Sequence, residues 1–228
     1  MHKIGTFEDF RHFATDKVKI SPSVVDDYQR KMVFPYIVEE RDAMVRTTEM
    51  NVFSKMINNR IVFLTGEVGM ESMDTIVAQL LYLDSADNRD IHIYINSPGG
   101  ECYSGLELVS VMDFIKSDVS TTVLGMAASM GAVIASNGTK GKRCLLPYSR
   151  FMIHQPSHHL GWTRFTDTKI AYEEMESVRN DLYEVMARNS GNSVEDVIAM
   201  CENGDKWMRP EEAIKLGFAD KIITKRGE

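Results

Sequence analysis

The chain has 228 residues, 43% of them hydrophobic, and its 26 basic and 33 acidic side chains give a formal net charge of −7. This length fits one large domain with a substantial buried core. The negative balance disfavours electrostatic capture of nucleic acid or of an anionic membrane surface, so neither partner is expected.

The cysteines and the hydropathy exclude further classes of protein. Cys102, Cys144 and Cys201 are odd in number and lack CxxC spacing, so we expect buried reduced thiols, not a disulfide framework or a zinc site. The sequence contains no run of 18 apolar residues and no apolar N-terminal segment typical of a secretory signal. We therefore expect a cytoplasmic protein.

The first segment, residues 1–34, mixes charged residues with the scattered aromatics Phe7, Phe10 and Phe13 and has no sustained periodicity. We predict that it is an N-terminal extension, either a tail or a pro-segment. The remainder, 35–228, is predicted to form a single domain.

From Arg60 onward, short β-branched runs alternate with amphipathic stretches, a pattern typical of an α/β domain. Short apolar runs bounded by turn residues predict buried strands of a parallel sheet at 61–64, 91–95, 121–124 and 151–153. Between them, 73–83 and 106–115 repeat apolar residues at intervals of three and four, which predicts crossover helices. This alternation suggests repeated ββα units.

Apolar residues from Ala171 to Met186 keep helical spacing up to Gly191, a good C-cap residue. Ser193 and Asp196 then predict the start of another helix. The long helix has two interpretations that spacing does not separate. It is either a plain surface helix or a projecting element that docks with another subunit.

Two glycine-containing segments follow predicted strands. In the first, 96–100 (NSPGG), the glycine pair frees the backbone to bring N–H groups close to an anion, although an ordinary tight turn needs the same residues. In the second, small residues bracket Ser129 between a strand and a predicted helix. Ser129 is either a helix N-cap or a nucleophile whose developing negative charge the N–H of Met130 would stabilise.

A base and an acid for such a nucleophile are available further along the chain. His154 ends a predicted strand next to Pro156 and is expected at the rim of a site. Asp205 lies in a predicted loop and is either the acid that orients the histidine or a solvated surface acid. Metal binding by His154 and His158 is disfavoured because Pro156 interrupts the helix that their spacing would need, and no metal or cofactor is expected.

Other motifs argue against two enzyme classes. GxSxG is absent, and the order Ser129, His154, Asp205 differs from the order in α/β hydrolases. A Walker phosphate loop is also absent, so we expect no ATPase activity from this chain.

The segments NSPGG, GMAASMGA, MIHQP and DKWM with a following EEA resemble, in order and approximate spacing, the peptidase subunits of the Clp protease family. The similarity runs from about Arg60 to Lys225. It implies the ClpP/crotonase fold, an α/β fold of repeated ββα units with a projecting handle helix at about 167–190. It also implies a serine endopeptidase with Ser129 as nucleophile, His154 as general base and acid, and Asp205 fixing the imidazole tautomer.

The resemblance further implies an oxyanion hole made by the N–H groups of Gly100 and Met130. It implies two stacked heptameric rings that enclose the active sites, with an AAA+ unfoldase feeding unfolded polypeptides inward. Family pockets that receive unfoldase loops align with Leu81, Tyr82, Tyr94, Phe114, Leu124 and Leu146, for which plain core packing is the alternative.

Three departures from the family pattern concern assembly and docking. His92 replaces a usual aromatic pocket residue, which affects the expected unfoldase affinity. The segment with His158, His159, Leu160 and Trp162 is poorer in glycine than the usual ring-contact strand. Asn203 and Gly204 lack the basic residue that commonly precedes the catalytic acid, so coupling between rings is expected to differ.

Two other functions remain as alternatives. A crotonase-type acyl-CoA enzyme would use two backbone donors around a thioester carbonyl and need no triad, which the presence of Ser129, His154 and Asp205 argues against. A catalytically silent ring subunit would usually lack one of these three residues.

Overall fold

The computed structural model describes residues 7–31, 36–39, 48–157 and 164–225. The strands are β1 (Tyr36–Glu39), β2 (Thr48–Asn51), β3 (Ile61–Val68), β4 (Ile91–Gly100), β5 (Val119–Ala128), β6 (Arg143–Leu145), β7 (Arg150–Ile153), β8 (Lys206–Met208) and β9 (Lys221–Ile222). The helices are α1 (Phe7–Asp16), α2 (Pro22–Lys31), α3 (Val52–Asn58), α4 (Met70–Ala86), α5 (Cys102–Phe114), α6 (Met130–Ser136), α7 (Phe165–Ser190), α8 (Val194–Glu202) and α9 (Pro210–Lys215).

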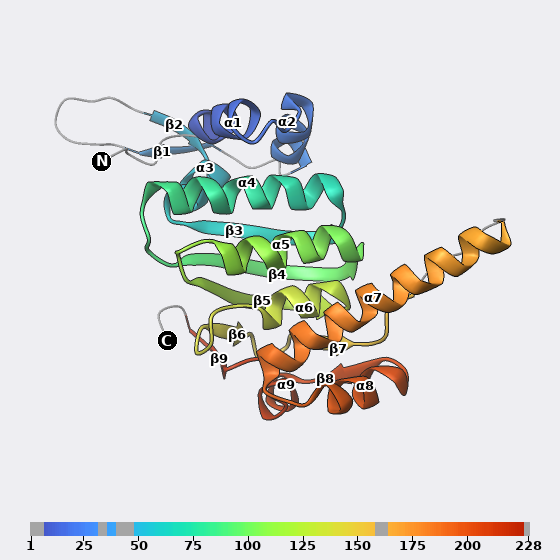
Figure 1. Cartoon of the computed structure of the whole chain (residues 1–228). Coiled ribbons are helices and arrows are strands. Elements are labelled where there is room, and N and C mark those ends of the chain that lie inside the picture. The colour runs from blue at the N-terminus through green and yellow to red at the C-terminus, as the bar shows by residue number, and fades with distance from the viewer. Residues whose placement is uncertain (1–6, 32–35, 40–47, 158–163, 226–228) are drawn as a thin grey trace.

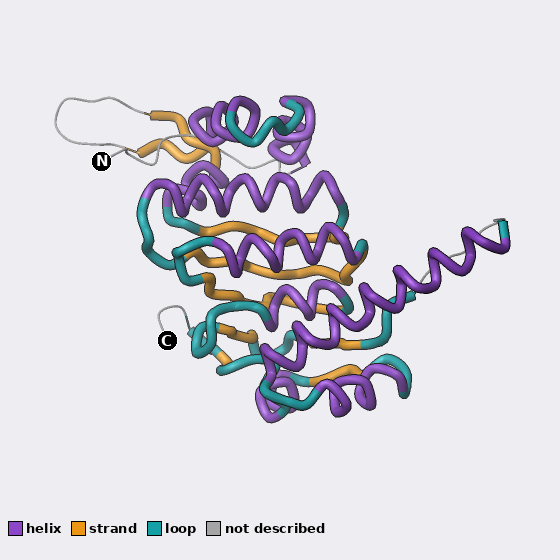
Figure 2. Tube along the Cα trace, in the orientation of Figure 1, coloured by secondary structure: helices purple, strands orange, loops and turns teal. Residues whose placement is uncertain are grey.

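The centre of the molecule is a largely parallel sheet of order β3-β4-β5-β6-β9. Helices α4, α5 and α6 follow β3, β4 and β5 in the chain and lie side by side along them (Figures 1 and 2). Fully buried residues such as Ile93, Leu80 and Leu108 fill the space between the layers. The predicted α/β class, strands and crossover helices are therefore confirmed.

Strand β5 changes partner halfway along its length. Its first half pairs with β6, from Thr121 to Val123, and its last residues, Met126 to Ala128, pair with β7. Between these halves β5 is bulged against β4, because Ile95 pairs with Val123 and Ser97 pairs with Ala127. The bulge bends the strand and redirects its carboxyl end toward β7.

The sheet departs from the predicted all-parallel arrangement at β8. This strand runs antiparallel to β7, with Ile153 opposite Lys206 and Phe151 opposite Met208. The chain reaches β8 through α7 and α8, which bring it back to the same end of β7, so it must run in the opposite direction. An antiparallel pair of this kind places the residues after one strand opposite the residues before the other.

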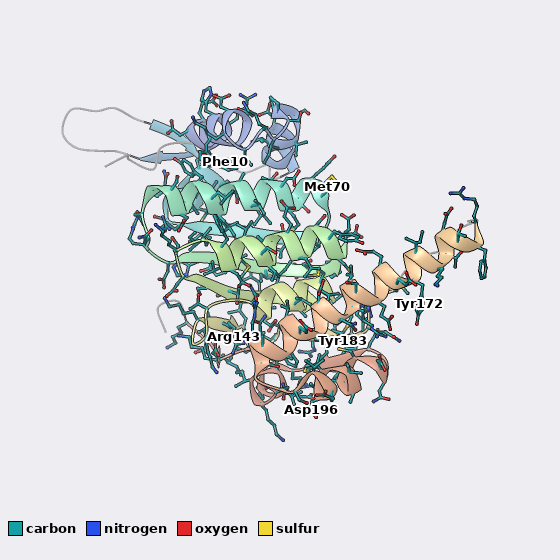
Figure 3. The ribbon with its side chains drawn as sticks, viewed as in Figure 1. Phe10, Met70, Arg143, Tyr172, Tyr183 and Asp196 are labelled. Atoms are coloured by element: carbon teal, nitrogen blue, oxygen red, sulfur yellow. The ribbon has the colours of Figure 1, made fainter. Side chains whose placement is uncertain are left out.

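The N-terminal extension contains two helices, α1 and α2, where the sequence analysis expects a tail or pro-segment. They contact α4, and Phe10, Ala14 and Val25 are fully buried there. Figure 3 shows Phe10 between α1 and the body. Its ring packs edge-on against the ring of Tyr82, with 6.2 Å between the ring centroids. A bidentate pair between Arg11 and the carboxylate of Asp26 joins the two helices.

Helix α7 spans the range predicted for the handle and ends at Ser190, followed by Gly191 as a left-handed C-cap with φ +79°. Its C-terminal half packs on the body through residues such as Leu182 and Tyr183, whereas its first half projects away (Figure 1). The projecting part carries the exposed side chains of Phe165, Ile170 and Tyr172. Within the described residues, no helix is long and apolar enough to cross a membrane.

Candidate active site

Ser129 occupies a sharp turn between the end of β5 and the start of α6. Its backbone has φ +55° and ψ −126°, an unusual conformation for a residue with a side chain. The Ser129 N–H donates to the carbonyl of Met152 in β7 at 2.9 Å, which ties the turn to the neighbouring strand. The side chain makes no N-cap hydrogen bond, so its hydroxyl group is available for another role.

His154 follows the last residue of β7 and reaches the same point. Because β5 and β7 are parallel, with Ala128 opposite Met152, the residues that follow both strands emerge at one edge of the sheet. His154 Nε2 lies 2.8 Å from Ser129 Oγ, within hydrogen-bonding distance, and the imidazole side chain is 26% exposed. This is the geometry in which an imidazole removes the proton from a hydroxyl group.

Asp205 approaches the other nitrogen of the ring. It directly precedes β8, and since Ile153 pairs with Lys206, the antiparallel register brings Asp205 opposite His154. Its Oδ1 lies 3.3 Å from His154 Nδ1. Gly204, with φ +101°, makes the turn that admits this approach. The structure therefore brings together all three residues that the sequence analysis selects.

A small pocket lies next to Ser129 and is mainly apolar. Its lining comes from α5, α6, β7 and α7, and includes Cys102, Met130, Val133, Ile153, Leu182, Tyr183 and Met186. Burial, followed by the nearby Glu101 carboxylate, raises the pKa of the Cys102 thiol. The thiol therefore stays protonated and is a poor nucleophile next to Ser129. Helical spacing in a sequence does not identify which neighbour a helix faces, so this pocket could not be predicted.

The NSPGG segment, predicted to follow a strand, instead forms the carboxyl end of β4 and lies directly against the Ser129 turn. A Cβ atom added to Gly99, whose φ is +94°, would lie 2.6 Å from Ser129 Cβ and 2.9 Å from Met130 N. Only glycine allows this approach, which brings the backbone next to the N–H groups in the first turn of α6. The predicted donors, Gly100 and Met130, thus belong to two segments in mutual contact.

Asn96 has a structural function that the sequence analysis did not identify. Its Oδ1 accepts the N–H of Met126 at 3.1 Å, within the bulge of β5. Gly125 leaves room for this side chain, since a Cβ atom there would lie 2.7 Å from Asn96 Oδ1. The Asn96 side chain therefore accepts the Met126 N–H at the point where the bulge interrupts the pairing of β4 with β5.

The predicted docking residues fall into separate groups. Tyr94, Leu124 and Leu146 line one open pocket together with His92, whose pKa is lowered by burial so that the imidazole is neutral at pH 7. Leu81 and Tyr82 lie on α4, where Tyr82 also contacts Phe13. Phe114, at the end of α5, is 80% exposed.

Some predictions concern residues outside the described ranges. His158, His159, Leu160 and Trp162 belong to the segment 158–163, so neither their part in a ring-contact strand nor the spacing of His154 and His158 is described. Among the residues that the structure does describe, no three His, Cys, Asp or Glu side chains form a group suited to a metal ion.

Comparison with known proteins gives a consistent picture. Residues 44–226 match the family described as Clp protease. An ATP-dependent Clp protease proteolytic subunit of Streptococcus thermophilus is 44% identical over 194 residues, which cover 84% of this chain and 97% of that protein. The protein of the same name from Bacteroides fragilis is 42% identical over 225 residues, which cover 96% of this chain and 100% of that protein. The Streptococcus salivarius protein is 45% identical over 194 residues, with 84% and 97% covered.

Proposed function

The chain belongs to the Clp protease family and is a peptidase, and we propose that it acts as a serine-type endopeptidase through Ser129, His154 and Asp205. The observation that carries this proposal is the continuous series of contacts from Ser129 Oγ to His154 Nε2, at 2.8 Å, and from His154 Nδ1 to Asp205 Oδ1, at 3.3 Å. A nucleophile, a base and an orienting acid in this sequence are the elements of a Ser-His-Asp triad.

The reaction has two steps. His154 Nε2 accepts the hydroxyl proton as Ser129 Oγ attacks the peptide carbonyl, and the resulting imidazolium gives that proton to the leaving amine, which leaves an acyl ester on Ser129. A water molecule, deprotonated by His154, then hydrolyses the ester and restores the hydroxyl group. Asp205 keeps the proton on Nδ1 and stabilises the imidazolium in both steps.

The negative oxygen that forms in each step is stabilised by the N–H groups of Gly100 and Met130. Support for Met130 comes from its position in the first turn of α6, immediately after Ser129. Support for Gly100 comes from the contact of the preceding residue, Gly99, with Ser129. The N–H of Gly99 itself donates to Ser97 Oγ and is therefore not available for the oxyanion. One such donor typically lowers the barrier by about 3 kcal/mol.

The proposal includes a partner that supplies energy. The relatives are ATP-dependent proteolytic subunits, and this sequence has no Walker phosphate loop, so an AAA+ unfoldase is expected to hydrolyse ATP and deliver unfolded polypeptides in the cytoplasm. The pocket lined by Tyr94, Leu124 and Leu146 suits an apolar loop of that partner. Leu81, Tyr82 and Phe114 complete the proposed docking set, and the Tyr82 ring in this set also packs against Phe10 and Phe13 of α1.

Assembly into two stacked heptameric rings is part of the proposal. Its support is the projecting half of α7, where Phe165 is 88% exposed and Ile170 65%, an arrangement typical of a surface covered by another subunit. The peptidase domain is assigned to 35–228 and the extension to 1–34. Mass determination of the purified protein tests whether the extension is removed.

The proposal is tested by labelling the assembled protein with a fluorophosphonate and locating the adduct by mass spectrometry. We expect labelling at Ser129 in the wild type and none in Ser129→Ala. Cleavage of an unfolded protein by the wild type, with an unfoldase and ATP, would agree with the partner. Intact rings that resist labelling with the unfoldase docked would overturn the proposal and favour a silent ring subunit, whereas turnover of acyl-CoA would favour a crotonase-type enzyme.

A further inference from the structure

Ser97 is a buried polar residue in the NSPGG segment, and the mechanism above does not use it. Its side chain is inaccessible to solvent, and its Oγ accepts the N–H of Gly99 at 3.1 Å. In β4 it pairs with Ala127, two residues before Ser129. The hydroxyl group therefore lies beneath the turn that carries the nucleophile.

Ser97 also contacts the helix that begins after the nucleophile. A Cβ atom added to Gly131 would lie 3.1 Å from Ser97 O, 3.2 Å from its Cβ and 3.4 Å from its Oγ. Ser97 thus accepts a hydrogen bond from Gly99 within its own segment and packs against the first turn of α6. These are the two backbone segments that contain Gly100 and Met130.

The Gly99–Gly100 peptide is held by the β3–β4 ladder, in which Glu67 pairs with Gly99 and Val68 pairs with Gly100, and by a side-chain hydrogen bond. Before it, the N–H of Gly99 donates to Ser97 Oγ; after it, the N–H of Glu101 donates to the carbonyl of Val68 at 2.8 Å. Gly100 has φ +150°, and Gly99 has φ +94°, so glycine's freedom must be restrained by such bonds to keep one orientation. Loss of the Ser97 acceptor would remove the side-chain restraint on this peptide and leave the pairing with β3.

We propose that Ser97 is a positioning residue that fixes the Gly100 N–H, and the first turn of α6, relative to Ser129 for stabilisation of the oxyanion. This inference rests on the proposed function. Donors aimed in advance at the developing charge accelerate a reaction because no reorganisation is needed when the charge forms. A donor displaced by a fraction of an ångström still permits substrate binding but stabilises the transition state less.

The test compares Ser97→Ala, which removes the acceptor, with Ser97→Cys, which keeps nearly the same shape but accepts hydrogen bonds weakly. Ser149→Ala is the matched control. Ser149 is equally inaccessible, and its Oγ makes one hydrogen bond to a backbone carbonyl, that of Leu146, away from the catalytic site. All rates are divided by the number of Ser129 sites that a fluorophosphonate labels at completion, so an unfolded fraction does not lower them.

The readouts are kcat and KM for a short fluorogenic peptide, and the inhibition constant of a peptide boronate that forms a tetrahedral adduct on Ser129. We expect both Ser97 variants to lower kcat about tenfold and to change KM less than twofold. The inhibition constant of the boronate should rise by about the same factor by which kcat falls. The pH dependence of kcat/KM should keep its shape, since His154 is untouched. Ser149→Ala should match the wild type in all of these.

Different results would separate the two proposals. A wild type that is neither labelled at Ser129 nor inhibited by the boronate would overturn the proposed function. A labelled wild type with Ser97 variants of unchanged kcat and unchanged boronate inhibition would overturn only the role of Ser97. If Ser97→Cys alone kept full activity, the loss in Ser97→Ala would come from the missing side-chain volume and not from the hydrogen bond. If neither variant folded, Ser97 would be needed for folding. Either result contradicts a positioning function.

Discussion

Replacement of Asp205 by asparagine tests the least buried part of the triad. At the 3.3 Å between His154 Nδ1 and Asp205 Oδ1, two unit charges attract by about 1 kcal/mol in bulk water and about 5 kcal/mol at an effective dielectric constant of 20. The aspartate side chain is 57% exposed and the imidazole 26%, so the environment lies between these limits. An intermediate stabilisation of the imidazolium of about 3 kcal/mol corresponds to a loss of about 10²-fold in kcat.

The assay is steady-state hydrolysis of a fluorogenic peptide by the assembled variant. Asp205→Asn keeps the shape of the side chain, so we expect a normal thermal transition, a KM close to that of the wild type, and a kcat lower by about 10²-fold. Glu211→Gln, at an exposed acid in α9, controls for the loss of one surface charge. A kcat within twofold of the wild type would refute the assignment of Asp205 as the orienting acid.

Three further predictions concern Asn96 next to the site, the buried pair of Arg143 and Asp220, and the N-terminal extension. Asn96→Ala should lower kcat about tenfold and stability by about 1 kcal/mol, because Met126 loses its hydrogen bond in the bulge; an unchanged kcat would show that the bulge persists without it. Asp220→Asn should destabilise the protein by about 3 kcal/mol at pH 7, since Arg143 is left buried without its charge partner. Burial tends to raise the pKa of Asp220, but the hydrogen bonds from Arg143 lower it overall, so this stabilisation is present above the ordinary carboxyl pKa and is lost as the pH falls through the lowered value. Urea unfolding measures this effect. The difference in the free energy of unfolding between the wild type and Asp220→Asn should be smaller below pH 4 than at pH 7. Phe10→Ala should lower the free energy of unfolding by about 3 kcal/mol, measured by thermal unfolding, because Phe10 is fully buried. An unchanged thermal transition would show that α1 does not stabilise the folded core.

The N-terminal extension shows a limit of pattern analysis. The aromatic residues at 7, 10 and 13 recur every third residue over only one short helix, and such a segment is stable only when it packs on something larger. The surface on α4 that buries Phe10 lies some 70 residues away in sequence, close to Tyr82. Local periodicity contains no information about that surface, so the packing of α1 on α4 could not be predicted from the sequence pattern.

The sequence by itself determined the α/β class and the principal strands, and its resemblance to the Clp protease family selected the three catalytic candidates. Apolar runs and helical spacing record local structure directly, and Ser129, His154 and Asp205 stand next to strand ends or in loops where reactive side chains are exposed. Only the tertiary structure decided how these residues meet. Parallel pairing of β5 with β7 aligns Ser129 with His154, and antiparallel pairing of β8 with β7 adds Asp205. Register between strands distant in sequence is fixed by packing of the whole sheet, and for this reason the distances within the triad and the position of Ser97 beneath it are properties of the folded chain.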